Sequence, residues 1–179
     1  SIHDIDGDGL IVDTWSNAVV ENNIAHHCAM HLGAMKAAVG LFNWNSDNVV
    51  FQYNECYANG IGGTWHTGNT VQTGVIAQDA QGIEVDALNH NTWVQFNYLH
   101  DNSCFMMLCC FSNQYISYDT CIRYNVSENE GCGKGTHMTM GYFYNGIHGI
   151  RTEFYNNTLI MSPNVLDGWT IKLLTFNNS

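Results

Sequence analysis

The chain has 179 residues, a formal net charge of −11, only five Lys and Arg in total, and one Pro beside 17 Gly. The negative charge argues against nucleic acid and against an anionic membrane surface as partners. No apolar run is long enough to cross a bilayer. We therefore expect a protein that is secreted or lies at the cell surface.

Short apolar or alternating runs end at Asn, Gly or Asp along the whole chain. In chain order the clearest are 9–13 (GLIVD), 48–53 (NVVFQY), 82–86 (GIEVD) and 92–96 (TWVQF). Such runs are typical of strands bounded by turns. The long Ala, Leu, Glu and Lys stretches of helical repeats are absent. The sequence therefore predicts an all-β protein.

A phrase made of an apolar or aromatic residue, an Asn and a polar turn returns six times at unequal intervals. Its anchors are Asn23, Asn54, Asn97, Asn125, Asn156 and Asn177. A fixed phrase at unequal intervals indicates one repeating unit with loops of variable length inserted at one place. At a tight corner Asn tolerates a left-handed backbone, and its amide can bond the Asn of the next coil.

These features predict a parallel β-helix solenoid of about six coils, in which residues 1–179 form one segment. Neither end carries an obvious amphipathic cap over the core and sheet edges. The sequence therefore predicts an uncapped internal part of a longer protein.

Three phrases carry a resemblance to a known superfamily. The pattern DGxG followed by apolar residues, the pattern V-x-[FY]-N-x-x-H-D-N and the run NNTLI resemble the right-handed parallel β-helix (pectate-lyase-like) superfamily, especially its bacterial carbohydrate-active members. The resemblance covers essentially the whole chain. It implies the right-handed fold and a polysaccharide partner. It does not fix the activity, because the superfamily includes lyases, hydrolases, epimerases, phage tailspikes and adhesins.

One outward strand column is the candidate catalytic site. Alternation in the strand at 82–86 places Glu84 and Asp86 on one side, and the matching strand at 9–13 offers Asp13. The coil between them places Trp44 or Asn43 near the same column. Asp13 and Asp86 would then lie two coils apart, roughly 9–10 Å, and Glu84 close to Asp86 could raise one carboxyl pKa. Two carboxyl groups at about this separation hydrolyse glycosides with inversion, and Trp44 would stack on a sugar ring. A solvated polar face is the structural alternative.

Two glycine-rich insertions are candidate walls of a substrate cleft, since sites form where loops overhang a rigid sheet. The first, 60–74, contains Trp65 and His66. The second, 131–146, contains Lys134 and His137. We expect both to emerge near the carboxylate column.

The N-terminal run DIDGDG resembles the first half of a calcium loop, with Asp4, Asp6 and Asp8 at alternate positions. Trp15 stands where the bidentate carboxylate of such a loop belongs. We expect a carboxylate-rich turn of the β-helix that could bind one Ca²⁺ in a geometry of its own.

The corners after the anchors carry His3, His26 and His100 at one offset. Stacked, they would form a column of imidazoles beside carboxylates. Such a column could bind a metal, move protons or hydrogen-bond between coils, and the last role is the commonest.

The favoured function is hydrolysis of an extracellular polysaccharide by Asp13, Glu84 and Asp86. A calcium-dependent polysaccharide lyase is the first alternative, although no Lys or Arg falls in the acidic column. A non-catalytic adhesin, tailspike-like shaft or filament module, associating end to end or laterally, is the second. The seven Cys include no CxxC pair, and the sequence leaves open whether they are buried thiols or disulfides.

Overall fold

A computed structural model describes the backbone of residues 1–32, 38–60, 64–67, 70–73, 81–102, 105–112, 117–130, 138–145, 151–160 and 172–175. Its side chains are described in 1–30, 38–60, 81–102, 117–130 and 151–160. Every regular element within these ranges is a strand. In this described part of the chain, no helix has the length and hydropathy needed to span a membrane.

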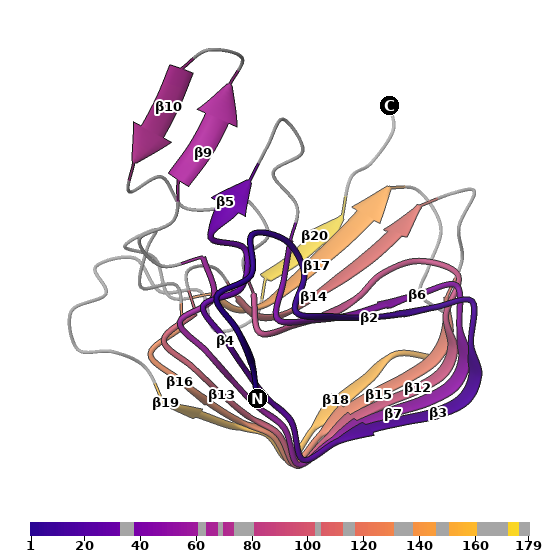
Figure 1. Ribbon diagram of the computed structural model, residues 1–179. Coiled ribbons are helices and arrows are strands. Elements are labelled where there is room, and N and C mark those ends of the chain that lie inside the picture. Colours follow the sequence, from indigo (N-terminus) through magenta and orange to yellow (C-terminus); the bar gives the residue numbers. More distant parts are fainter. Residues whose placement is uncertain are drawn as a thin grey trace.

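Three sheets of parallel strands form three sides of a triangle when viewed along the stack (Figure 1). Sheet A contains β1 (Ile2–His3), β4 (Ile24–His26), β8 (Glu55–Tyr57), β13 (Tyr98–His100), β16 (Val126–Glu128) and β19 (Thr158–Ile160). Sheet B contains β2 (Leu10–Asp13), β6 (Leu41–Trp44), β11 (Ile83–Val85), β14 (Phe105–Ser112), β17 (Met138–Asn145) and β20 (Lys172–Thr175). Sheet C contains β3 (Ser16–Glu21), β7 (Asp47–Gln52), β12 (His90–Gln95), β15 (Tyr118–Arg123) and β18 (Glu153–Tyr155).

The chain visits sheets B, C and A in turn, and each new strand pairs in parallel with the strand of the preceding visit. Two residues always separate a sheet C strand from the next sheet A strand, as at 22–23 and 53–54. The longest connections run from sheet A to sheet B, at 27–40 and 58–82. They include β5 (His31–Leu32) and the antiparallel hairpin of β9 (Thr64–Thr67) and β10 (Thr70–Thr73). The prediction of an all-β protein with parallel sheets is confirmed, and this strand order is what a parallel β-helix requires.

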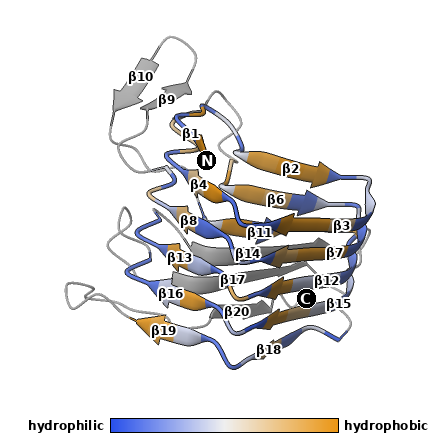
Figure 2. Ribbon diagram, turned by 60° about the horizontal axis from the view of Figure 1, so that its bottom comes forward, coloured by the Kyte–Doolittle hydropathy of each residue, from blue (hydrophilic) through white to orange (hydrophobic). Residues whose placement is uncertain are grey.

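The inward side chains of the three sheets form a continuous apolar core. Alternate residues along each strand point inward, so that Leu41 and Ile83 of sheet B meet Phe51 and Val94 of sheet C, all fully buried. Figure 2 shows the apolar residues along the strands and the hydrophilic ones at the corners between sheets. Burial of this core is the main stabilising term of the fold.

An asparagine ladder closes the corner between sheets C and A. Each member donates its backbone N–H and its Nδ2 to the Oδ1 of the next member at 2.9–3.1 Å. The members are Asn23, Asn54, Asn97, Asn125 and Asn157. The predicted amide ladder is therefore present with one correction: the fifth anchor is Asn157 and not Asn156. Asn177 lies outside the described residues.

The left-handed backbone falls on the residue before each ladder Asn, not on the ladder Asn as we predicted. The φ angle is 56° at Asn22, Tyr53, Phe96 and Tyr124 and 54° at Asn156. Such angles are uncommon for bulky residues. They turn these side chains outward while the following Asn points into the corner, which explains why Asn156 is exposed.

Candidate functional site

The parallel register brings two of the three predicted catalytic carboxylates, Asp13 and Asp86, into one column on the outer face of sheet B. Asp13 of β2 pairs with Trp44 of β6. The Asp86 N–H bonds the Asn43 carbonyl at 2.9 Å, which continues the pairing of β11 with β6 and places Asp86 beside Trp44. Trp44, and not the inward and fully buried Asn43, therefore stands between the two carboxylates. At the usual strand spacing, the backbones of Asp13 and Asp86 lie roughly 9–10 Å apart.

Neighbouring groups hold both carboxylates in place. Asp13 is exposed, and its Oδ1 accepts a 2.8 Å hydrogen bond from the Thr14 hydroxyl. Asp86 is half-buried, and its Oδ1 accepts the backbone N–H of Ala87 at 2.7 Å. Trp15, two residues beyond Asp13, exposes 66% of its surface. The column thus offers two carboxylates and an aromatic side chain along one line, with a second aromatic beside it.

Glu84 lies in the adjacent outward column, between Phe42 of β6 and Leu108 of β14. Although its position faces outward, only 5% of its surface is exposed. Gln81 Nε2 donates to Glu84 Oε2 at 2.7 Å. Alternation predicted the outward face for Glu84, and the structure places it there but buries it, whereas Asp13 and Asp86 are more accessible.

The four loop residues predicted to bind substrate are only partly described. Trp65 and His66 lie in β9, where the backbone of Trp65 pairs with Leu32 of β5 and that of His66 with Val71 of β10. Lys134 and His137 lie outside the described residues. Their assignment to a substrate cleft remains a prediction.

The three N-terminal carboxylates have different surroundings. Asp4 accepts from His3 Nδ1 at 2.8 Å, which lowers its pKa. Asp8 Oδ1 accepts the Val39 N–H at 2.7 Å, and burial raises the pKa of Asp8. Within the described part of the chain, no three His, Cys, Asp or Glu side chains gather closely enough to hold a metal ion. Calcium binding by Asp4, Asp6 and Asp8 therefore stays a prediction.

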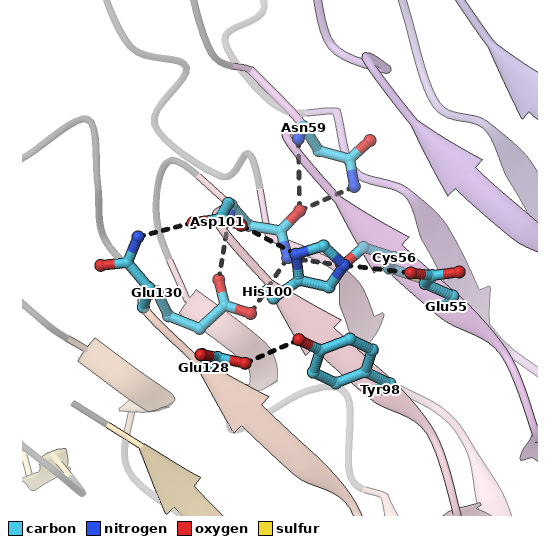
Figure 3. A network of polar contacts seen from close by, with 10 residues as sticks. Glu55, Cys56, Asn59, Tyr98, His100, Asp101, Glu128 and Glu130 are labelled. Carbon is cyan, nitrogen blue, oxygen red and sulfur yellow. Dashed lines mark hydrogen bonds and ion pairs between the residues drawn. The ribbon is translucent and has the colours of Figure 1, made fainter. Parts of the chain in front are cut away.

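The predicted imidazole column is present on the outer face of sheet A. His3, His26, Tyr57 and His100 stack in parallel with ring centroids 4.8–4.9 Å apart. Desolvation, and then the neighbouring His3, lower the pKa of His26. His100 faces carboxylates with both nitrogens, Asp101 Oδ2 at 2.8 Å from Nδ1 and Glu55 Oε1 at 3.2 Å from Nε2 (Figure 3). These stacking contacts join neighbouring strands of sheet A, and metal binding or proton transfer by the column stays a prediction.

A second ladder at the end of sheet A finishes on a buried glutamate (Figure 3). Asn59 donates to Asn102, and Asn102 donates its N–H to Glu130 Oε2 at 3.1 Å and its Nδ2 to Oε1 at 3.0 Å. Glu130 is fully buried, and this desolvation raises its pKa to about 8 despite the two hydrogen bonds. The sequence analysis missed Glu130, although Asn59, Asn102 and Glu130 each lie five residues after a ladder Asn.

The sequence analysis also missed an aromatic column at the corner between sheets C and A. Tyr53, Phe96 and Tyr124 occupy the left-handed position and stack with centroids 5.4 and 5.2 Å apart. The signal was present in the aromatic residue that precedes three of the Asn anchors. A hollow of about 390 Å³ lies beside this column.

Comparison with known proteins gives one informative similarity. A lacto-N-biosidase of Bifidobacterium longum subsp. longum is 25% identical over 163 residues, which cover 86% of this chain. The chain spans 9% of that relative's length. No family model matches the chain, and no solved structure matches it.

Proposed function

We propose that the chain is a segment of a glycoside hydrolase that acts on an extracellular polysaccharide. In this proposal the segment is a right-handed parallel β-helix of about six coils, and the protein is secreted or lies at the cell surface. The observation that carries the proposal is the single column of Asp13, Trp44 and Asp86 on sheet B. The name of the similar bacterial protein, lacto-N-biosidase, is that of a glycosidase and supports the same class.

The two carboxyl groups take different roles in this proposal. Asp86 is half-buried and lies two residues from Glu84 along the same outward face, a setting that favours a proton donor to the glycosidic oxygen. Asp13 is exposed and can activate a water molecule as the general base. The backbones that carry them lie roughly 9–10 Å apart, at the upper end of the about 6.5–9.5 Å between the carboxyl groups of inverting enzymes, and this spacing leaves room for that water. Trp44, between them, gives the sugar ring an apolar face on which to stack.

A lyase needs a base near the substrate uronate, and the described cations do not supply one. Arg123 bonds Gln95 and Tyr155, and Arg151 forms an ion pair with Asp119, all on sheet C or next to it. The backbone of Lys172 shares the column of Glu84 but lies three strands away, roughly 14 Å. Hydrolysis is therefore the better proposal.

The test is release of reducing ends from a panel of polysaccharides, with ultraviolet absorbance to detect unsaturated products and EDTA to remove calcium. Asp13→Asn and Asp86→Asn should each lower kcat by about 10²–10⁴-fold, the usual contribution of a general acid or base. The matched control is Asp47→Asn, an exposed carboxylate on sheet C. Activity that survives both variants, or unsaturated product that EDTA abolishes, would refute the proposal.

A further inference from the structure

The hollow at the corner between sheets C and A is separate from the carboxylate column. Its lining comes from sheet A and the corner residues before it: Asn22, Asn23, Ile24, Tyr53, Asn54, Glu55, Phe96 and Tyr98. No sheet B residue contributes, and Figure 1 shows this corner on the opposite side of the triangle from sheet B. Its volume of about 390 Å³ falls within the usual range of small-molecule sites, about 300–1,000 Å³.

The hollow runs beside the aromatic column, along Phe96 and Tyr53, and past the end of the column to Asn22. One face of the Tyr53 ring packs on Phe96, with 5.4 Å between centroids and 11° between planes. The next residue at the same corner position is Asn22, which has the same φ of 56° but no ring. Within the described residues no other ring packs on Tyr53, and 54% of its surface is exposed. An aromatic face therefore ends the column uncovered.

Hydrogen-bonding groups surround this ring face. The Asn22 amide has no partner within the described residues. Glu55 uses Oε1 toward His100, which leaves Oε2 as an acceptor. Tyr98 donates its hydroxyl to Glu128 at 2.6 Å, and this bond raises the pKa of Tyr98 to about 12, so its oxygen stays a protonated phenol that can accept.

The charge of the lining selects the ligand class. Glu55 is the charged residue among the lining residues, and no Lys or Arg is among them. An acidic lining on a protein of net charge −11 disfavours a uronate or a sulfated sugar. An apolar ring face beside an amide and a carboxylate fits a neutral sugar ring, which presents C–H groups on its face and hydroxyls at its edge.

We propose that this hollow is a second saccharide-binding site, which takes a neutral sugar ring of a polysaccharide against Tyr53 and between Asn22 and Glu55. The inference rests on the proposed function in one respect, that polysaccharide is the ligand of this protein. Binding here would hold a long chain to the protein from the side opposite the carboxylate column.

The first variant fills the hollow without disturbing the fold. Asn22→Tyr places a ring at a corner position whose equivalents already carry Tyr53, Phe96 and Tyr124 at the same φ. The new ring would extend the stack and occupy the place of the sugar. Tyr53→Ala removes the stacking face instead. The matched control is Tyr124→Ala, which also removes one ring of the column but lies outside the hollow, beside Tyr155 and Arg123.

The assay is affinity electrophoresis in native gels that contain galactomannan, xyloglucan or mixed-linkage β-glucan, with polygalacturonate as the anionic comparison. Retardation of the wild type by a neutral polysaccharide should weaken about tenfold in Asn22→Tyr and Tyr53→Ala, equivalent to about 1.4 kcal/mol. It should change less than about twofold in Tyr124→Ala. Thermal unfolding of each variant confirms that it is folded.

The outcomes separate this proposal from the catalytic one. No retardation of the wild type by any neutral polysaccharide, equal retardation of wild type and Asn22→Tyr, or tighter binding of polygalacturonate would overturn the second site. Retardation that Asn22→Tyr abolishes, without any release of reducing ends, would support the site and refute the proposed hydrolase. Hydrolysis that depends on Asp86, with binding unaffected by Asn22→Tyr, would do the reverse.

Discussion

Replacing Glu130 by Gln should remove a pH dependence that this buried carboxyl group gives to the stability of the wild type. The folded protein holds the Glu130 proton up to a pH of about 8, whereas the ordinary value for a glutamate is 4.5. Between these values the folded state binds one more proton than the unfolded state. Unfolding therefore releases a proton, and the free energy of unfolding falls as the pH rises through this window.

The size of the effect follows from the pKa difference. Each unit corresponds to about 1.36 kcal/mol, so Glu130 alone should cost the wild type on the order of 3 kcal/mol between pH 4.5 and pH 7. A Gln at this position has no proton to lose. Its single amide oxygen can still accept both Asn102 donors, as Asn102 Oδ1 does for Asn59 at 3.2 and 2.8 Å.

The measurement is urea unfolding of both proteins at several pH values from 5 to 8, followed by circular dichroism. Other titrating groups cancel in the difference between the two proteins. The stability of Glu130→Gln relative to the wild type should rise steadily with pH. Glu130→Ala is the control for the hydrogen bonds, because it leaves two buried Asn102 donors without an acceptor and should be less stable at every pH. A difference between wild type and Glu130→Gln that stays constant with pH would refute the reasoning.

Three further outcomes are expected. Asn97→Ala should lower the free energy of unfolding by about 2–4 kcal/mol, because Asn54 loses the acceptor of two buried donors. Asn156→Gly, at an exposed left-handed corner, should change the free energy of unfolding by less than about 0.5 kcal/mol. Urea titration of the two variants measures both effects. Cys28, whose pKa burial raises to about 11, and buried Cys56 should react with a thiol reagent at pH 8 only after unfolding. Rapid labelling of Cys28 or Cys56 themselves in the native protein, located by peptide mass mapping, would contradict this burial. If hydrolysis is found, the first product resolved by NMR should have the inverted anomeric configuration, and retention would exclude the roles proposed for the two column carboxylates.

The sequence predicted the outward columns best where only one residue of each repeat could occupy the column position. Matching the runs at 9–13 and 82–86 correctly predicted that Asp13 and Asp86 share one column, because parallel strands in register align equivalent positions. The same reasoning stacked His3, His26 and His100. These predictions needed only the repeat and the alternation of a strand.

The prediction failed where two neighbouring residues could each fill a role. Asn156 and Asn157 form a doublet, and Asn suits both the left-handed corner and the ladder. Only the following strand, which must pair Thr158 with Val126, decides that Asn157 is the ladder member. The alternation rule placed Glu84 on the outward face but could not predict its burial, because the rule gives the face that a side chain takes and not what covers that face.

The polar ladders explain how such a sheet can vary its surface chemistry without changing its fold. A slip of one residue would break the bonds between successive ladder Asn side chains and turn every strand side chain to the opposite face, so the register is strongly specified. Each outward column can then change residue by residue. At the left-handed corner the same backbone carries a stacked ring at Tyr53 and an amide at Asn22, and both side chains line the hollow. On sheet B, Trp44 separates two carboxylates for the same reason. We therefore expect function in this protein to depend on single outward positions. The inward Asn, Leu, Ile and Val stabilise the fold and fix the register in which these outward positions align.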